Sequence, residues 1–133
     1  MGEVIVRLEN LKKHFGDVVA VDDMNLEIEE GEFVTLLGPS GCGKTTTLRM
    51  IAGLEMPTSG SLYLEGQDVT YTAPEKRPVN MVFQAYALFP HMTIAENIAF
   101  GPMIKKWPKE EIQQGVEDML KIVRLEGYGT RKP

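Results

Sequence analysis

The sequence predicts a mixed α/β fold, and three observations lead to that class. β-rich stretches fill the first 32 residues, two continuously apolar runs follow at Phe33–Leu37 and Val79–Phe83, and helix-type patterns lie after each run. A continuously apolar run of this length suits a strand of a parallel sheet covered on both faces. We therefore expect an antiparallel β region first, a parallel core next and further helices last.

The size, charge and cysteine content limit the classes of function. The chain has 133 residues and a net charge of -5, so one hydrophobic core is expected and no basic field would attract nucleic acid. No apolar run approaches the roughly 20 residues that span a bilayer, and the start MGEVIVRLEN lacks the features of a signal peptide. The single cysteine, Cys42, excludes an internal disulfide and fits a reducing compartment. We expect a cytosolic protein.

Three short strands are predicted before residue 32. Val4–Leu8 is rich in β-branched residues, Val18–Val21 is a short apolar run, and Met24–Ile28 alternates with a period of two. The turn Glu29–Glu32 then leads into the first continuously apolar run, Phe33–Leu37.

The segment Gly38–Thr47, GPSGCGKTTT, matches the phosphate-binding pattern G-x-x-x-x-G-K-[ST]. It directly follows a predicted strand, and a helix is predicted over Lys44–Ala52, ended by Gly53 because glycine adopts a left-handed cap at little cost. The pattern therefore lies in the strand, loop and helix order that it requires. The alternative is a glycine-rich turn without a ligand, which this context disfavours.

The chemistry of such a loop depends on its backbone. Glycines let N–H groups converge on phosphate oxygens, and the following helix presents its positive end to them. Lys44 would reach the β and γ phosphates, the Thr45 hydroxyl would ligate Mg²⁺, and Thr46 is a candidate for the α phosphate. The predicted nucleotide-binding residues of the loop are Gly38, Pro39, Ser40, Gly41, Cys42, Gly43, Lys44, Thr45 and Thr46.

Beyond the loop helix, the pattern returns briefly to strand. The turn Pro57–Gly60 introduces a predicted strand at Ser61–Glu65, and the polar segment Gln67–Arg77 is interpreted as a loop. The second apolar run, Val79–Phe83, is predicted to be a buried strand that leads into Gln84.

Two more helices are predicted in the last third of the chain. Thr93–Glu96 matches a capping box, which starts a short helix that ends near Gly101. The last helix begins around Pro108, with acidic residues near its positive end. Its apolar stripe is predicted to consist of Ile112, Val116, Met119, Leu120 and Val123.

The whole chain resembles the ATP-binding subunit of ABC (ATP-binding cassette) transporters. The resemblance rests on an aromatic residue in KKHFG, the phosphate-loop segment, the turn PTSGSLYLEG and the segment VNMVFQAYALFPHMTIAENIAFG, which come in family order. It implies a P-loop NTPase (RecA-like) core with an N-terminal antiparallel β subdomain. It also implies a division into an antiparallel subdomain (1–32), a P-loop core with a β insert (33–84) and the Q-loop with the start of a helical subdomain (85–133).

The resemblance implies roles for residues outside the loop. Phe15 matches the aromatic residue that stacks on adenine, although a packed core phenylalanine is the alternative. Gln84 matches the Q-loop glutamine, which reaches Mg²⁺ and the attacking water, so it joins Lys44 as a catalytic residue; a polar residue at a strand end is the alternative. Ala85–Met92 matches the docking surface for the transmembrane permease, and His91 within it is interpreted as an interface or core residue.

At the level of the whole protein, the resemblance implies an ATPase that binds ATP with Mg²⁺ between two head-to-tail copies. Such a protein would lie on the cytoplasmic face of the membrane and drive import through permease subunits. The amino-acid sequence of the second half is most similar to those of polyamine importers, followed by maltose, iron and sulfate importers. A soluble ABC ATPase of DNA repair or translation and a non-catalytic nucleotide-binding module are the alternatives.

Three parts of a complete hydrolytic site are absent from this sequence. It has no LSGGQ signature, no Walker B strand after the phosphate loop and no later catalytic histidine. Val18–Asp23 (VVAVDD) has the composition of a Walker B strand but precedes the loop, so we interpret its two aspartates as part of a solvated turn. We expect the chain to be an N-terminal portion, truncated within the helical subdomain, that binds nucleotide without efficient turnover. With only two predicted parallel strands, it should be marginally stable or associate through open sheet edges.

Overall fold

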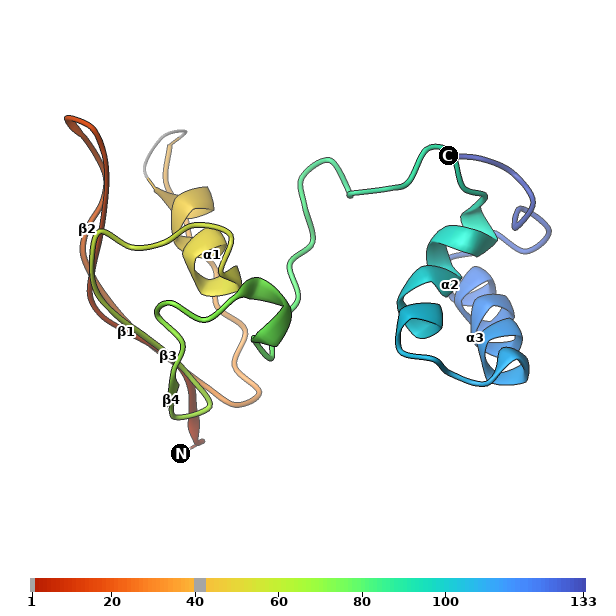
Figure 1. Ribbon diagram of the computed structural model, residues 1–133, viewed down its shortest axis with the longest axis horizontal. Helices are drawn as coiled ribbons and strands as arrows, with labels where there is room; N and C mark the ends of the chain where they lie inside the picture. The colour runs from red at the N-terminus through yellow and green to blue at the C-terminus, as the bar shows by residue number, and fades with distance from the viewer. Residues whose placement is uncertain (1, 40–42) are drawn as a thin grey trace. The chain divides into compact units, whose positions relative to one another are not determined.

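The structure is a computed structural model that describes residues 2–39 and 43–133 (Figure 1). The chain divides into two units, Met1–Met81 and Val82–Pro133, and each is described by itself. Within the described residues, the first unit contains the β strands, one α-helix and one short 3-10 helix, and the second contains two α-helices.

A four-stranded antiparallel sheet forms most of the first unit (Figure 1). Strands β1 (Val4–Phe15) and β2 (Val18–Glu29) make a hairpin, β3 (Ser59–Leu64) pairs with the other edge of β1, and β4 (Gln67–Asp68) pairs with β3. The strand order is therefore β2-β1-β3-β4. The predicted antiparallel region at the N-terminus is confirmed.

The first strands are longer than predicted. The three stretches merge into two strands of 12 residues each. Asn10 and Asp23 take left-handed backbone conformations, and the pairing shifts register between Leu8 and Leu11. Such irregularities let a strand continue past polar residues that break a simple alternating pattern. Asp22 and Asp23 are solvated as expected, but they lie within β2 rather than in a turn.

Helix α1 (Lys44–Ala52) matches the predicted helix at both ends. Gly53 caps its C-terminus with φ of 83°, a conformation that glycine adopts without a Cβ penalty. The Met50 side chain is fully buried and joins the strand side chains of the core. The buried core of this unit consists of Leu8, Leu11, Val21, Met50, Leu62, Leu64 and Val69.

The two predicted parallel strands are not formed. Phe33–Leu37 and Val79–Phe83 have irregular backbone, and the side chains of Phe33, Leu37 and Val82 are 94%, 88% and 85% exposed. A strand of a parallel sheet is held by hydrogen bonds to its neighbours. Within the described residues, ladder pairing involves β1 to β4 only. The apolar composition of a buried strand is therefore present, but its pairing is not.

The segment Gln67–Arg77 is also more ordered than the predicted loop. It contains β4 and a 3-10 helix, η1 (Pro74–Lys76). The main-chain N–H of Val69 donates to the carbonyl of Leu62 at 2.9 Å, which extends the pairing of this segment with β3.

Helices α2 (Ile94–Ile104) and α3 (Lys109–Ile122) pack against each other in the second unit. The capping box at the start of α2 is confirmed, and the helix continues past the predicted end, through Pro102. Of the predicted stripe on α3, Leu120 is buried, whereas Met119 and Val123 remain about half exposed. In residues 2–39 and 43–133, no helix combines the length and the apolarity that a membrane crossing needs.

Candidate nucleotide-binding site

The phosphate loop is described on both sides of residues 40–42. Ser40, Gly41 and Cys42, three of the predicted binding residues, lie outside the described residues. Gly38 and Pro39 precede them without regular secondary structure, and Gly43 and Lys44 begin α1. The ammonium group of Lys44 donates a hydrogen bond to the Gly38 carbonyl, which joins the two ends of the loop.

Gly43 fixes the start of α1 against the sheet. It occupies the N-cap with φ of 89°, and a Cβ added there would lie 2.3 Å from the Ala20 carbonyl oxygen and 3.1 Å from Val21 Cγ2. Only glycine tolerates both the left-handed backbone and this approach to β2. The Gly43 carbonyl accepts hydrogen bonds from the Thr47 N–H at 2.9 Å and the Thr47 hydroxyl at 2.8 Å. The loop is therefore anchored to β2 where the helix begins.

The three consecutive threonines have different surroundings. Thr47 is fully buried and uses its hydroxyl within the helix, whereas Thr45 is exposed and Thr46 is half-buried. Mg²⁺ needs few protein ligands when phosphates and water supply the rest of its octahedron. An exposed hydroxyl at the first turn of α1 fits that requirement, so Thr45 is a suitable magnesium ligand. Among the described residues, no cluster of three His, Cys, Asp or Glu side chains could hold a metal.

Phe15 lies at the end of β1, opposite Val18 across the hairpin. Its side chain is 47% exposed, so it is not the packed core phenylalanine that was the alternative. The Lys13 ammonium lies 5.0 Å from the centre of its ring and is itself held by Glu55 at 2.9 Å and the Met56 carbonyl at 2.8 Å. The ring thus presents an aromatic surface to solvent in the same unit as Lys44.

Gln84 belongs to the second unit, where it begins an exposed turn. In this turn Tyr86 and Ala87 both take left-handed backbone conformations. The predicted site residues thus divide into those of the first unit, around α1 and the β1–β2 hairpin, and Gln84 in the second.

The segment Ala85–Met92 is exposed at its start and ordered at its end. Tyr86 and Leu88 are exposed, whereas the Phe89 ring packs 4.6 Å from that of Phe100. Asn97 on α2 holds the backbone of this end: its side chain accepts from the Phe89 N–H at 2.9 Å and donates to the Phe89 carbonyl at 3.1 Å. His91 is exposed, which removes the core alternative for it.

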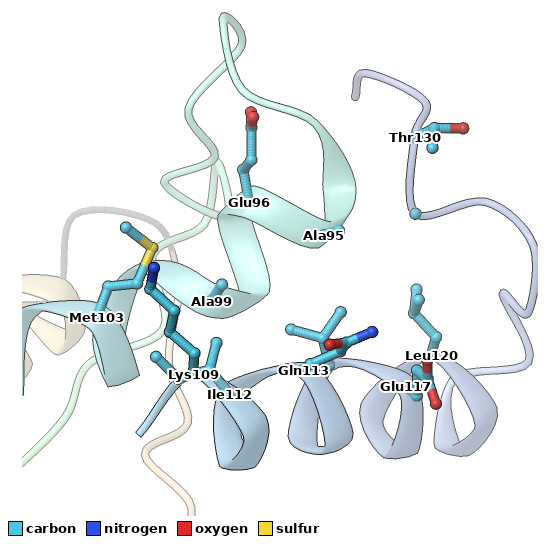
Figure 2. Close-up of a pocket in the computed structure, with 12 residues that line it drawn as sticks. Ala95, Glu96, Ala99, Met103, Lys109, Ile112, Gln113, Glu117, Leu120 and Thr130 are labelled. Carbon is cyan, nitrogen blue, oxygen red and sulfur yellow. The ribbon is translucent and has the colours of Figure 1, made fainter. Parts of the chain in front are cut away.

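A cavity of about 550 Å³ lies within the second unit, between α2 and α3 (Figure 2). Apolar side chains dominate its lining, including Ala99, Ile112, Val116 and Leu120. None of the predicted nucleotide-site residues lines it. It lacks the converging donors that phosphate needs, so it is a gap in the packing of these helices and not the nucleotide site.

Sequence reasoning missed two residues that shape the site region. Thr47 anchors the first turn of α1 from inside, and Arg77 is buried although its segment was interpreted as loop. Helical spacing could have placed Thr47 on the core face, three residues before Met50. No local pattern predicts the role of Arg77, because partners such as Met50 lie far from it in the sequence.

An antiparallel sheet beside a loop of phosphate-binding pattern and the helix that follows it is the arrangement expected of the N-terminal part of a P-loop nucleotide-binding cassette. The chain belongs to the ABC transporter family, whose sequence pattern matches residues 21–133. The resemblance found from the motifs is therefore confirmed.

Two curated relatives illustrate the match. The spermidine/putrescine import ATP-binding protein PotA of Chromobacterium violaceum is 55% identical over 129 residues, which cover 97% of this chain and 36% of that protein. The sulfate/thiosulfate import ATP-binding protein CysA of Gloeobacter violaceus is 54% identical over 128 residues, which cover 96% and 37%. The chain thus spans about a third of the length of these relatives.

Solved structures confirm the fold. The dimeric structure of MJ0796, a bacterial ABC transporter cassette, matches with a TM-score of 0.83 and 33% identity, over 97% of this chain and 62% of that one. A dimeric post-hydrolysis state of the same cassette, bound to ADP and Pi, matches with a TM-score of 0.77 and 32% identity over the same shares.

Proposed function

We propose that this chain is the ATP-binding portion of an ABC importer ATPase and that it holds Mg·ATP at the N-terminus of α1. The observation that carries the proposal is the phosphate-loop pattern, in which Gly43 packs against β2 and Lys44 takes the first helical position. Identities of 54–55% to import ATP-binding proteins over almost the whole chain support the family assignment behind it.

In this proposal each residue has a chemical task. The backbone N–H groups of residues 43–46, at the start of α1, surround the phosphates, and the helix dipole of α1 favours their negative charge. The Lys44 ammonium, which now bonds the Gly38 carbonyl, exchanges that partner for the β and γ phosphate oxygens. Thr45 supplies an oxygen to Mg²⁺, whose role is to neutralise phosphate charge, and Phe15 stacks on the adenine base.

The sequence contains the pattern for nucleotide binding but not all of the motifs that hydrolysis requires. Phosphoryl transfer requires groups that orient the attacking water and stabilise the charge that develops on the γ phosphate. Gln84 is the proposed water-positioning residue, but the sequence contains no LSGGQ and no Walker B strand after the loop. We therefore propose that these 133 residues bind nucleotide with little turnover, and that a complete cassette hydrolyses it.

The proposal extends to partners and location. A complete cassette would pair head to tail with a second copy and dock on permease subunits through Ala85–Met92, on the cytoplasmic face of the membrane. The exposed Tyr86 and Leu88 side chains support a contact surface there, since an apolar patch rimmed by polar residues marks many interfaces. A polyamine is the proposed cargo, on the strength of the similarity to PotA proteins. The proposed subdomain boundaries are at residues 32 and 84.

Lys44→Ala tests the proposed function. Loss of the ammonium should weaken the affinity for Mg·ATP at least tenfold, about 1.4 kcal/mol, because charge-assisted bonds to phosphate are lost. Isothermal titration calorimetry on the whole chain measures this, with Lys132→Ala, which removes an exposed lysine elsewhere, as the matched control. Equal Mg·ATP affinity in the two variants would remove the basis of the proposal.

A further inference from the structure

Arg77 is a buried cation whose hydrogen bonds all go to main-chain carbonyls. The residue is 6% exposed. Its Nε donates to the Thr72 carbonyl at 2.9 Å, one terminal nitrogen donates to Met50 at 2.7 Å and Ile51 at 3.2 Å, and the other donates to Thr70 at 3.3 Å. Four acceptors around one guanidinium satisfy a buried polar group that would otherwise be costly.

Two of these acceptors belong to the last turn of α1. The final carbonyls of a helix lack helical partners and carry the negative end of its dipole, so a cation beside them is stabilising. Gly53 keeps the space open, because a Cβ at that position would lie 2.7 Å from the Arg77 Nε. Burial lowers the pKa of Arg77, yet an arginine keeps its charge in proteins. The guanidinium thus adds side-chain donors to the last carbonyls of α1, beside the backbone cap that Gly53 provides.

One of the other two acceptors, Thr70, connects Arg77 to the sheet. The Thr70 hydroxyl accepts from the Leu62 N–H at 3.0 Å, and Val69, next to Thr70, donates to the Leu62 carbonyl at 2.9 Å. Leu62 lies in β3 and is buried in the core. A continuous set of contacts therefore leads from β3 through Thr70 and Arg77 to the end of α1.

This arrangement holds α1 at both ends. Gly43 fixes the N-terminus against β2, and Arg77 fixes the C-terminus against the segment that follows β3. A helix of nine residues is about 13 Å long, so a tilt of about 10° about one end moves the other by roughly 2 Å. A displacement of that size exceeds what a positioned phosphate contact tolerates.

We propose that Arg77 is a positioning residue for the phosphate site, which acts by fixing the direction of α1 from the end opposite to Lys44. The inference rests on the proposed nucleotide-binding function. Arg77 makes its contacts with the far end of the helix, so its effect on the ligand passes through the orientation of the helix.

The test compares Arg77→Met, which removes the charge and all donors, with Arg77→Lys, which keeps the charge but loses the fork. Lys76→Met is the matched control, because it removes an exposed positive charge one residue away. The probes are Mg·ATP and inorganic tripolyphosphate with Mg²⁺, which contacts only a phosphate site. We expect Arg77→Met to weaken both affinities about tenfold, Arg77→Lys to restore part of the loss and Lys76→Met to leave both unchanged.

The outcomes separate this inference from the proposed function. If the unsubstituted chain binds neither probe, the proposed function fails. If the unsubstituted chain binds Mg·ATP, two results would overturn the inference. One is that folded Arg77 variants bind both probes as well as Lys76→Met does. The other is that they lose affinity for Mg·ATP but not for tripolyphosphate. Thermal unfolding followed by circular dichroism reports the fold. Should Arg77→Met not fold, Arg77→Lys decides by the same criteria, and failure of both to fold also overturns the inference, since Arg77 would then serve the fold as a whole.

Discussion

The helices α1 and α2 begin in opposite ways. At α2, the Thr93 hydroxyl accepts from the Glu96 N–H at 3.1 Å, and the Glu96 carboxylate accepts from the Thr93 N–H at 2.7 Å. The next two amides, of Ile94 and Ala95, donate to main-chain carbonyls near the C-terminus at 2.7 Å and 2.9 Å. At α1, the N-cap is Gly43, and within the described residues no side chain caps the helix.

This difference indicates that the N-terminus of α2 has a structural role only, whereas that of α1 is suited to binding a ligand. Helix α2 satisfies its first N–H groups within the protein, so its N-terminus offers no donors to an anion. Helix α1 lacks a side-chain cap and is held in place from elsewhere, by Gly43 against β2 and by Arg77 at its C-terminus. Tertiary contacts thus replace local capping at the helix start where, in the proposed function, the N–H groups bind phosphate.

Gly43→Ala should break the comparison most severely. The added methyl group would lie 2.3 Å from the Ala20 carbonyl, in a backbone conformation that L-residues disfavour. We expect unfolding free energy to fall by more than about 2 kcal/mol and Mg·ATP affinity to fall more than about tenfold. Chemical denaturation and calorimetry measure the two effects.

Gly66→Ala is the control for that substitution. Gly66 has a similar φ of 77°, but an added Cβ would meet nothing within 4 Å. Gly66→Ala therefore has the unfavourable backbone conformation without the clash. We expect its unfolding free energy to fall by about 1 kcal/mol and its Mg·ATP affinity to stay unchanged. Equal losses in the two variants would show that the approach of the loop to β2 is unimportant.

Thr93→Ala tests the other side of the comparison. Removal of the N-cap hydroxyl should lower the stability of α2 by about 1 kcal/mol and leave Mg·ATP affinity unchanged, because α2 uses its cap for structure only. Amide hydrogen exchange at residues 94–98 reports the local effect, with Thr35→Ala, an exposed threonine of the first unit, as the control. A large drop in Mg·ATP affinity would contradict the assignment of purely structural capping to α2.

Local signals explain what the sequence could predict. The capping box at Thr93 and the glycine end of α1 at Gly53 depend on neighbours within a few residues, so both were predicted correctly. The phosphate-loop pattern could be recognised for the same reason, because its spacing encodes a local backbone shape, and its role in binding nucleotide stays a prediction.

Non-local pairing explains what could not be predicted. Phe33–Leu37 has the composition of a buried strand, but a parallel strand needs partners that its own residues do not specify, and here most of its side chains are exposed. The role of Arg77 depends on carbonyls up to 27 positions away in the chain, so no window around it reveals that role. Exposure of Phe15 likewise follows from its place at the end of a long hairpin, which its short motif does not determine.

The smallest effect on stability and on Mg·ATP affinity is expected from Asp68. Its carboxyl contacts Thr70, so protonation of Asp68 should weaken the contacts that hold α1 to the sheet. Hydrogen bonds from the Thr70 hydroxyl at 2.6 Å and the Thr70 N–H at 3.0 Å hold the pKa of the Asp68 carboxyl below its usual value of 3.8. A carboxyl with a lowered pKa in the folded state contributes stability above its unfolded pKa and loses it as pH falls through the folded value. Because Asp68 is exposed, water screens much of this contribution.

Asp68→Asn should therefore destabilise the first unit slightly at about pH 6 and reduce the loss of stability between about pH 5 and pH 2. Urea unfolding across that range measures the slope, with Asp17→Asn, an exposed carboxylate in the β1–β2 turn, as the control. Since Thr70 lies between β3 and Arg77, Mg·ATP affinity of the unsubstituted chain should decline over the same pH range more steeply than that of Asp68→Asn. Parallel pH profiles in the two proteins would show that the Asp68–Thr70 contact does not reach α1.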